Sequence, residues 1–213
     1  MHEKQKTIVT PLLELSDLHV SIRTPRNDVH AVRGVDLTVN AGETLALVGE
    51  SGCGKSMTAM SIAGLLPNNA AIIRGDVLLN GARLHDCSES EWHRVRGEQI
   101  GFVFQNPMSS FNPSMRIGDQ IAEVLRAHLS LSKQTARQRA VQLLDRMHIA
   151  NAAARGRQYP FEMSGGMFQR AMIAMAVACE PKLLIADEPT TALDVTVQKE
   201  VLQLLDELRR EHD

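Results

Sequence analysis

The strongest constraint on the fold of this chain is a glycine-rich loop that joins an apolar run to a helical pattern. Residues 49–56 fit the pattern G-x-x-x-x-G-K-[ST], with serine in the last place. The apolar run before the loop, residues 44–48, is expected to form a strand buried on both faces of a parallel sheet. Helical spacing follows over about 55–66, where Pro67 ends it. A strand, a glycine loop and a helix in this order predict a site for phosphate groups.

The residue types of the loop suit a nucleotide polyphosphate with Mg²⁺. Glycines let the backbone curl so that successive N–H groups point at an anion, and the helix N-terminus adds partial positive charge. Lys55 is placed to meet the outer phosphates, and the Ser56 hydroxyl to bind Mg²⁺. A plain glycine turn is the alternative, and the lysine–serine pair directly after Gly54 weighs against it. The predicted nucleotide-binding residues of the loop are Gly49, Glu50, Ser51, Gly52, Cys53, Gly54, Lys55, Ser56 and Met57.

Two acids follow a second apolar run, residues 183–186. Parallel sheets bind ligands at the carboxyl ends of their strands, where Asp187 and Glu188 would lie, together with Gly49 if the two strands are neighbours. Asp187 is then predicted to hold the Mg²⁺ shell and Glu188 to polarise an attacking water. Acids at a strand end are also ordinary solvated turn residues. The presence of the phosphate loop favours the catalytic interpretation.

Strand and helix patterns alternate along the rest of the chain. Alternating runs predict half-exposed antiparallel strands at 13–15 and 35–39, with a turn near 25–28. Further strands are expected at 76–79, before an Asn-Gly turn, and at 100–104. Helices are predicted over 117–147 with a break at 130–133, over 165–179, and in a last segment with Val201, Leu204, Leu205 and Leu208 on one face.

This order of elements predicts an α/β fold with a parallel-sheet core, an N-terminal antiparallel β subdomain and an inserted α-helical subdomain. We expect a single domain, residues 1–213. Within it, the helical subdomain (106–158) is inserted into the nucleotide-binding core (1–105 and 159–213).

Composition narrows the class of protein. Lys and Arg number 23 against 25 Asp and Glu, a formal net charge of −2, which gives no support to nucleic-acid binding. The longest apolar stretch, 171–179, is too short to span a membrane, and residues 1–7 are too polar for a secretory signal. The 3 cysteines have neither disulfide-framework nor zinc-site spacing, which favours a reducing cytosol. Any link to a membrane is therefore expected to come through a partner.

Residues 163–170, M-S-G-G-M-F-Q-R, resemble the signature motif of ABC ATPases, whose usual form is L-S-G-G-Q. Gln105, after Phe-Val-Phe, resembles the Q-loop of that family, and Ala192-Leu193-Asp194 resembles its D-loop. Together with the phosphate loop and the acid pair, these motifs stand in the family's order. The resemblance covers essentially the whole chain and implies a P-loop NTPase core of the RecA-like type.

The resemblance also implies a site shared between two subunits, with ATP and Mg²⁺ as cofactors. In such ATPases two chains pair head to tail, so that Ser164, Gly165 and Gly166 of one meet the γ-phosphate held by the other. Gln105 would act with Glu188 and Lys55 in catalysis, while its loop, 106–113, touches the membrane partner. The implied Mg²⁺ ligands are Ser56, Gln105 and Asp187.

Three stretches, residues 104–113, 164–167 with 169–170, and 186–194, resemble the peptide/nickel importer branch of the family, and 159–163 lean towards its nickel or metal-chelate members. This implies ATP hydrolysis coupled to uptake of peptides or nickel chelates. The implied partners are integral membrane permease subunits, a second ATPase subunit in a homo- or heterodimer and, indirectly, a periplasmic or extracellular solute-binding protein. The implied location is the cytoplasmic face of the bacterial inner membrane, as a peripheral subunit.

The chain departs from the family pattern in a few places. Met163 and Met167 replace the usual Leu and Gln of the signature. No aromatic residue is evident for stacking on adenine, and Arg26 or His30 are the candidates to replace it. The family's switch histidine follows a further strand after the last helix, and His212, at the tail of that helix, does not match it.

The missing histidine leads us to expect a chain truncated at its C-terminus. One alternative function is therefore a nucleotide-binding or dimerisation fragment with little hydrolysis. Another is a non-transport ABC ATPase of DNA repair or translation. The absence of a long coiled-coil insertion or a tandem cassette from this sequence disfavours the second alternative.

Overall fold

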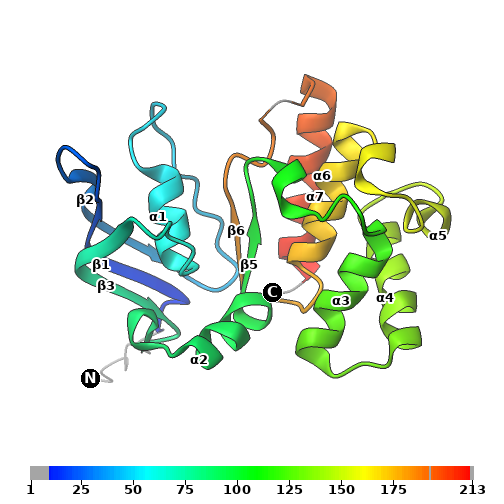
Figure 1. Ribbon diagram of the computed structural model, residues 1–213, viewed down its shortest axis with the longest axis horizontal. Helices are drawn as coiled ribbons and strands as arrows, with labels where there is room; N and C mark the ends of the chain where they lie inside the picture. Colours follow the sequence, from blue (N-terminus) through cyan, green and yellow to red (C-terminus); the bar gives the residue numbers. More distant parts are fainter. Residues whose placement is uncertain (1–9, 192, 212–213) are drawn as a thin grey trace, which may run out of the picture. The chain divides into compact units, whose positions relative to one another are not determined.

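The computed structural model describes residues 10–191 and 193–211, and the chain divides into two compact units, Met1–Ser88 and Glu89–Asp213 (Figure 1). The expectations for residues 1–7, for Ala192 and for His212 fall outside the described residues. The boundaries of the helical insertion, 106–158, stay a prediction.

The first unit is built on an antiparallel sheet in the order β2-β1-β3-β4 (Figure 1). Its strands are β1 (Leu13–Ile22), β2 (Val29–Val39), β3 (Ala70–Leu79) and β4 (Ala82–Arg83). The central strand β1 pairs with both neighbours, so that Leu13 lies opposite Val39 on one side and Leu79 on the other. Helix α1 (Lys55–Ile62) contacts β1, β2 and β3, and η1 (Leu84–Asp86) follows β4. The predicted antiparallel strands and the Asn-Gly turn are thus confirmed.

Residues 44–48 do not form the predicted strand within the first unit. These residues lie outside the strands of the first unit, with Leu45 at 43%, Leu47 at 46% and Val48 at 93% exposure. A strand needs a neighbour to pair its backbone N–H and C=O groups. Within residues 10–88 the four strands pair only among themselves, and none of them pairs with 44–48. An apolar run therefore does not become a buried strand through its own composition.

The second unit contains a parallel pair of strands and most of the helices (Figure 1). Strand β5 (Ile100–Val103) pairs with β6 (Leu183–Ala186), with Ile100 opposite Leu183 and Val103 opposite Ala186. The other elements are α2 (Glu89–Arg94), η2 (Val95–Gln99), η3 (Pro107–Ser110), α3 (Ile117–Leu129), α4 (Lys133–Arg146), α5 (Ala152–Arg155), η4 (Pro160–Glu162), α6 (Gly165–Ala176) and α7 (Val195–Glu211). The prediction that β6 is buried on both faces is only partly met, since Leu183 is buried and the other three residues are half-buried. Among the described residues of its own unit, β6 pairs with β5 alone.

Local sequence explains where the helices of this unit begin and end. Ser130, at φ 51, ends α3 in the left-handed conformation. The Ser132 hydroxyl then accepts a hydrogen bond from Thr135 N at 3.1 Å and caps α4. The predicted helical break is therefore confirmed.

A single apolar core joins these helices. Its most buried large side chains are Ile117, Ile121, Leu125, Leu144, Met147, Ile149, Met172 and Ile173. Helix α7 contributes the predicted stripe, with Val201, Leu204 and Leu208 buried and Leu205 partly buried. Among the residues that the structure describes, no helix has the length and apolarity that crossing a membrane requires.

Candidate functional site

The backbone of the phosphate loop requires glycine at its centre. Gly52 and Gly54 have φ values of 82 and 99, in the left-handed region that L side chains rarely adopt. A Cβ at Gly54 would lie 2.4 Å from the carbonyl oxygen of Ala31, whereas a Cβ at Gly52 would meet nothing within 4 Å. Gly54 is therefore needed both for its conformation and for the close approach of β2.

Lys55 lies across this loop and closes it. Its Nζ donates to the carbonyl oxygens of Gly49 at 2.8 Å and Glu50 at 2.9 Å, and lies 3.8 Å from Cys53 Sγ. Lys55 is also the first residue of α1, whose N-cap Gly54 supplies no side-chain hydrogen bond. The ammonium group thus lies at the positive end of the helix, and two positive charges at one place suit the binding of a polyphosphate.

The two candidates for contact with a nucleotide base differ in their surroundings. His30 is exposed in β2 and directly precedes Ala31, the residue whose carbonyl lies against Gly54. Arg26 is exposed in the bend between β1 and β2. The structure thus places His30 in a strand beside the phosphate loop.

The acid pair lies at the carboxyl ends of the paired strands β5 and β6. Asp187 N donates to Val103 O at 2.9 Å, which extends the strand pairing by one step, and the Asp187 side chain is buried. Glu188 follows in the left-handed conformation, at φ 47, and its Oε2 accepts a hydrogen bond of 2.6 Å from Gln105 Nε2. The structure thus brings Gln105, Asp187 and Glu188 together, while their roles in catalysis stay a prediction.

Thr191 belongs to this group and was not predicted from the sequence. Its Oγ1 donates to Glu188 Oε2 at 3.0 Å, so the carboxylate has two hydrogen-bond donors. The available signal was a threonine three residues after an acid in a turn-forming segment. That spacing alone does not reveal which way the chain bends after β6.

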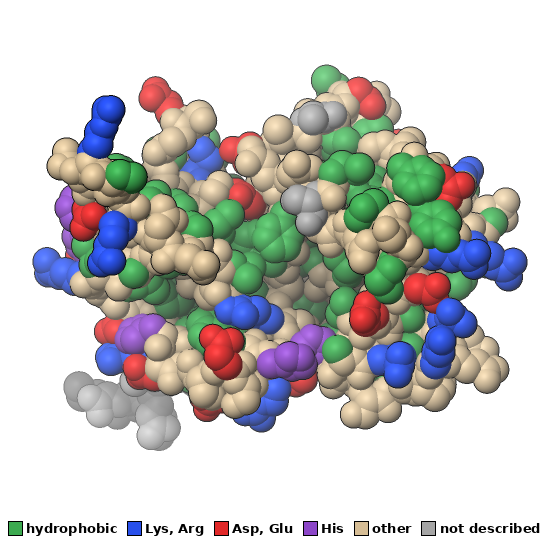
Figure 2. Space-filling view, in the orientation of Figure 1, with side chains coloured by type: hydrophobic (Ala, Val, Ile, Leu, Met, Phe, Trp, Pro, Cys, Tyr) green, Lys and Arg blue, Asp and Glu red, His purple; other side chains and the backbone are tan. Residues whose placement is uncertain are grey.

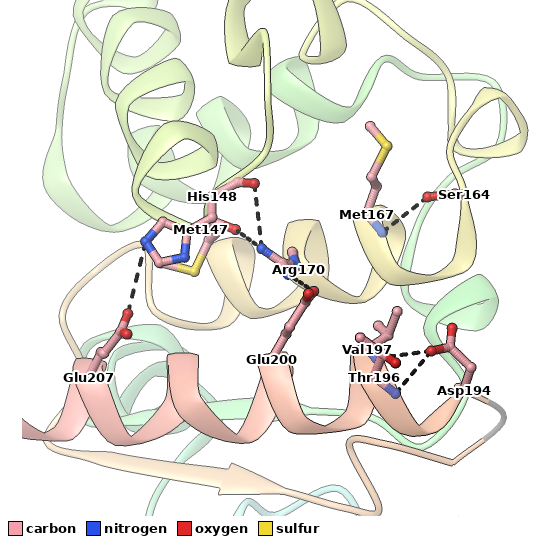
Figure 3. Close-up of polar contacts among 10 residues, drawn as sticks. All are labelled: Met147, His148, Ser164, Met167, Arg170, Asp194, Thr196, Val197, Glu200 and Glu207. Carbon is pink, nitrogen blue, oxygen red and sulfur yellow. Dashed lines mark hydrogen bonds and ion pairs between the residues drawn. The ribbon is translucent and has the colours of Figure 1, made fainter.

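The turn of the signature-like motif begins α6. The Ser164 hydroxyl accepts from Met167 N at 3.5 Å and caps the helix, and Gly165 and Gly166 form its first turn (Figure 3). A Cβ at Gly166 would lie 2.9 Å from Val197 Cγ1, so the first turn of α7 packs directly on it.

Helix α7 begins with a cap of its own. Asp194 Oδ1 accepts from the backbone N of Thr196 and of Val197, each at 3.1 Å (Figure 3). The Gln198 side chain donates to the carbonyl oxygens of Thr190 at 3.3 Å and Leu193 at 3.0 Å. These bonds attach Thr190 and Leu193 to the first turn of α7.

Each unit therefore carries one part of the predicted site. The first unit holds the loop residues 49–57, and the second holds Gln105, Asp187, Glu188 and the turn 164–166. On the visible face of each unit, acidic and basic side chains are interspersed (Figure 2). Within the described part of the chain, no cluster of three or more His, Cys, Asp and Glu is arranged to hold a metal. Mg²⁺ commonly needs only one or two carboxylates when substrate phosphates complete its shell.

Known proteins resemble this chain closely. It is 52% identical over 200 residues to the oligopeptide transport ATP-binding protein of Salmonella typhimurium, covering 94% of this chain and 59% of that protein. The corresponding Bacillus subtilis protein is 50% identical over 206 residues, covering 96% and 58%. The dipeptide transport ATP-binding protein of Lactococcus lactis is 47% identical over 199 residues, covering 93% and 57%. The chain thus spans less than two thirds of the length of these curated relatives.

Solved structures share the fold. A dimeric ATP-binding cassette in a post-hydrolysis state with ADP and Pi matches with a TM-score of 0.83 at 27% identity, covering 93% of this chain and 83% of that one. The structure of cbiO1 from Clostridium perfringens, described as part of an ABC transporter complex, matches with a TM-score of 0.77 at 27% identity, covering 95% of this chain and 75% of that one. These matches confirm the predicted α/β fold of the P-loop NTPase type. Residues 32–191 match the family model described as ABC transporter, and the chain belongs to that family.

Proposed function

We propose that this chain is the ATP-binding and ATP-hydrolysing part of an ABC importer for peptides. The observation that carries the proposal is the contact between Gln105 and Glu188, 2.6 Å apart, beside the buried Asp187 at the ends of two parallel strands. An amide and two carboxylates in this position suit a magnesium ion and an attacking water.

The roles of the residues follow from their chemistry. The loop 49–57 would hold the phosphates of ATP through backbone N–H groups and Lys55. Ser56, Gln105 and Asp187 would hold Mg²⁺, which neutralises the charge that develops on the phosphates. Glu188 would orient and polarise the water, and its hydrogen bonds from Gln105 and Thr191 fix the direction of its carboxylate.

A second ATPase subunit completes the proposed site. The first turn of α6, with Ser164, Gly165 and Gly166, would offer its hydroxyl and amides to ATP held by that subunit, as helix N-termini bind anions. Support comes from the similar cassette whose solved structure is dimeric with ADP and Pi. The segment 106–113, which includes η3 and follows Gln105, would contact the permease subunits on the cytoplasmic face of the membrane.

The names of the relatives favour peptides as cargo. They are oligopeptide and dipeptide transport proteins, and their identity with this chain extends over more than nine tenths of its length. Nickel chelates are therefore the less favoured cargo. A solute-binding protein would deliver the cargo to the permease subunits.

The substitution Glu188→Gln tests the hydrolytic role. It keeps the shape of the side chain and one acceptor oxygen but removes the negative charge, so we expect ATP affinity to be retained and turnover to fall by at least about 100-fold. Steady-state phosphate release and binding of a fluorescent ATP analogue measure the two properties.

The matched control is Glu123→Gln, the same change at an exposed position of α3. It should leave both turnover and affinity unchanged. Turnover of Glu188→Gln equal to that of the unaltered chain would contradict the proposed water-polarising role. An unaltered chain that binds ATP but turns over no faster than Glu188→Gln would favour the alternative of a binding fragment.

A further inference from the structure

Arg170, on α6, joins three segments of the second unit (Figure 3). Its side chain is only 14% exposed, and its Nη2 lies 2.5 Å from Glu200 Oε2 on α7. Its Nη1 donates to the carbonyl oxygens of Met147 at 3.3 Å and His148 at 3.4 Å, where α4 ends. The guanidinium group thus binds a carboxylate and the negative end of a helix together, which its forked geometry allows.

The first turns of α6 and α7 lie side by side. Gly166 approaches Val197 at the start of the two helices, and Arg170 meets Glu200 about one turn further along each. Ser164 caps the first of these helices and Asp194 the second. The Arg170–Glu200 pair is therefore the next contact after the two caps.

An acidic face of α7 extends this contact. Its members Glu200, Glu207 and Glu211 are seven and four residues apart, so they lie on one side of the helix. Glu207 Oε2 lies 3.9 Å from His148 Nε2, and Glu211 pairs with Arg146 at the end of α4. Among the described residues, the pair with Arg170 is thus one of three ion-pair contacts that attach α7 to the segment 146–148 and to α6.

We propose that Arg170 is a positioning residue that holds the turn 164–166 in a fixed place relative to Asp194 and to the end of α4. Through Arg170, the two capped turns and the end of α4 form one rigid body. The consequence for activity rests on the proposed function, in which the turn 164–166 meets ATP on a second subunit. A rigid turn would meet that ATP without first having to be ordered.

The test compares two substitutions that each remove one ion pair with α7. Arg170→Met keeps the aliphatic stem but loses the contacts to Glu200, Met147 and His148, whereas Arg146→Met loses only the pair with Glu211. Amide hydrogen exchange of the nucleotide-free chain is measured for peptides covering 164–168 and 193–198. We expect exchange in both peptides to rise by roughly tenfold in Arg170→Met and to stay unchanged in Arg146→Met. Equal exchange in the two variants would overturn the proposal.

A second measurement connects the positioning to the proposed function. In the Glu188→Gln background, ATP-dependent dimerisation is followed by sedimentation, and Arg170→Met should raise the dimer dissociation constant by roughly tenfold. Arg170→Lys should recover part of this loss, because an ammonium group can pair with Glu200 but cannot also reach both carbonyl oxygens. The affinity of the undimerised chain for ATP should not change in Arg170→Met. Unchanged dimerisation by a folded Arg170→Met would also contradict the proposal.

The two measurements separate the failure of this inference from the failure of the proposed function. If the Glu188→Gln chain itself does not dimerise with ATP, the proposed function is at fault, and the exchange experiment still decides the role of Arg170. If Arg170→Met does not fold, Glu200→Gln takes its place, since Glu200 is 48% exposed and its loss leaves the core intact.

Discussion

The phosphate loop and the acid pair are held in different ways. Lys55 is bound to acceptors only five and six residues before it, and the loop conformation depends on two glycines inside the motif. Glu188 is bound by Gln105, 83 residues away in sequence, and the two meet only because β5 and β6 pair in parallel. The first half of the site is therefore held mainly by local contacts, with β2 approaching it at Gly54, whereas the second half is a product of the sheet.

This difference shows which kinds of evidence identify each half. A short motif is sufficient to identify a structure whose contacts lie within that motif. By sequence alone, two consecutive acids do not identify a site. The pairing of β5 with β6 places them beside Gln105, and this contact indicates the site. Substitutions in the loop should accordingly act on the loop itself, and those in the second unit through its packing.

The largest effect that we predict is loss of nucleotide affinity in Lys55→Ala. Two charge-assisted hydrogen bonds to phosphate, at about 2 kcal/mol each, amount to about 4 kcal/mol, or roughly a 1,000-fold rise in the dissociation constant. Titration calorimetry with ATP and Mg²⁺ measures it. Lys182→Ala, an exposed lysine just before β6, should bind ATP as the unaltered chain does. Unchanged affinity in Lys55→Ala would show that the loop is not the phosphate site.

The next effect concerns the backbone of the loop, and it compares Gly54→Ala with Gly52→Ala. Both residues have positive φ, which costs a non-glycine residue about 1 kcal/mol. Only at Gly54 would the new Cβ also meet a backbone oxygen at 2.4 Å, so we expect a loss of about 3 kcal/mol in the free energy of unfolding there. Urea unfolding followed by circular dichroism gives both values. Equal losses in the two variants would show that the approach of Ala31 is not a real constraint.

The smallest effect is a pH dependence that arises in the second unit. His128, on α3, lies with its ring 4.9 Å from that of His93, and its Nδ1 lies 3.7 Å from Glu98 Oε1. Burial lowers the pKa of His128 below its usual 6.5, the positive charge of His93 lowers it further, and Glu98 opposes the change. A lowered pKa in the folded state means that the unfolded chain binds the proton more tightly. Stability is therefore present above pH 6.5 and is lost as the pH falls below it.

Thermal unfolding between pH 7.5 and 5.5 measures this dependence, with His128→Gln as the comparison. The unaltered chain should lose melting temperature as the solution is acidified, and the variant should lose less. An identical slope for the two proteins would remove His128 as the cause. Because His128 lies in the second unit, the same titration should leave ATP affinity at the loop of the first unit largely unchanged.

Much of the fold could be predicted from local patterns. Alternation of apolar and polar residues predicted β1 and β2, and the Asn-Gly pair predicted the turn after β3. The break at 130–133, where Ser132 caps α4, separated α3 from α4. These features depend on residues close together in sequence, so the pattern and the structure have the same cause. The residues of the phosphate loop could be identified for the same reason.

Other features could not be predicted, because distant parts of the chain decide them. The apolar run 44–48 has the composition of a buried strand, but its exposure depends on which strands are available to pair with it. Arg170 stands in the motif 163–170, but its partner Glu200 lies 30 residues further along the chain on another helix, and no local pattern indicates that contact.

The sequence by itself determined the family, the phosphate loop and the identity of the acids, because in each case the chemistry lies in consecutive residues. Only the tertiary structure decided that Gln105 contacts Glu188, and that Arg170 contacts Glu200 on α7 and the end of α4. The physical reason is that a hydrogen bond requires two groups within about 3 Å of each other. For residues far apart in the chain, only strand pairing and helix packing bring them that close.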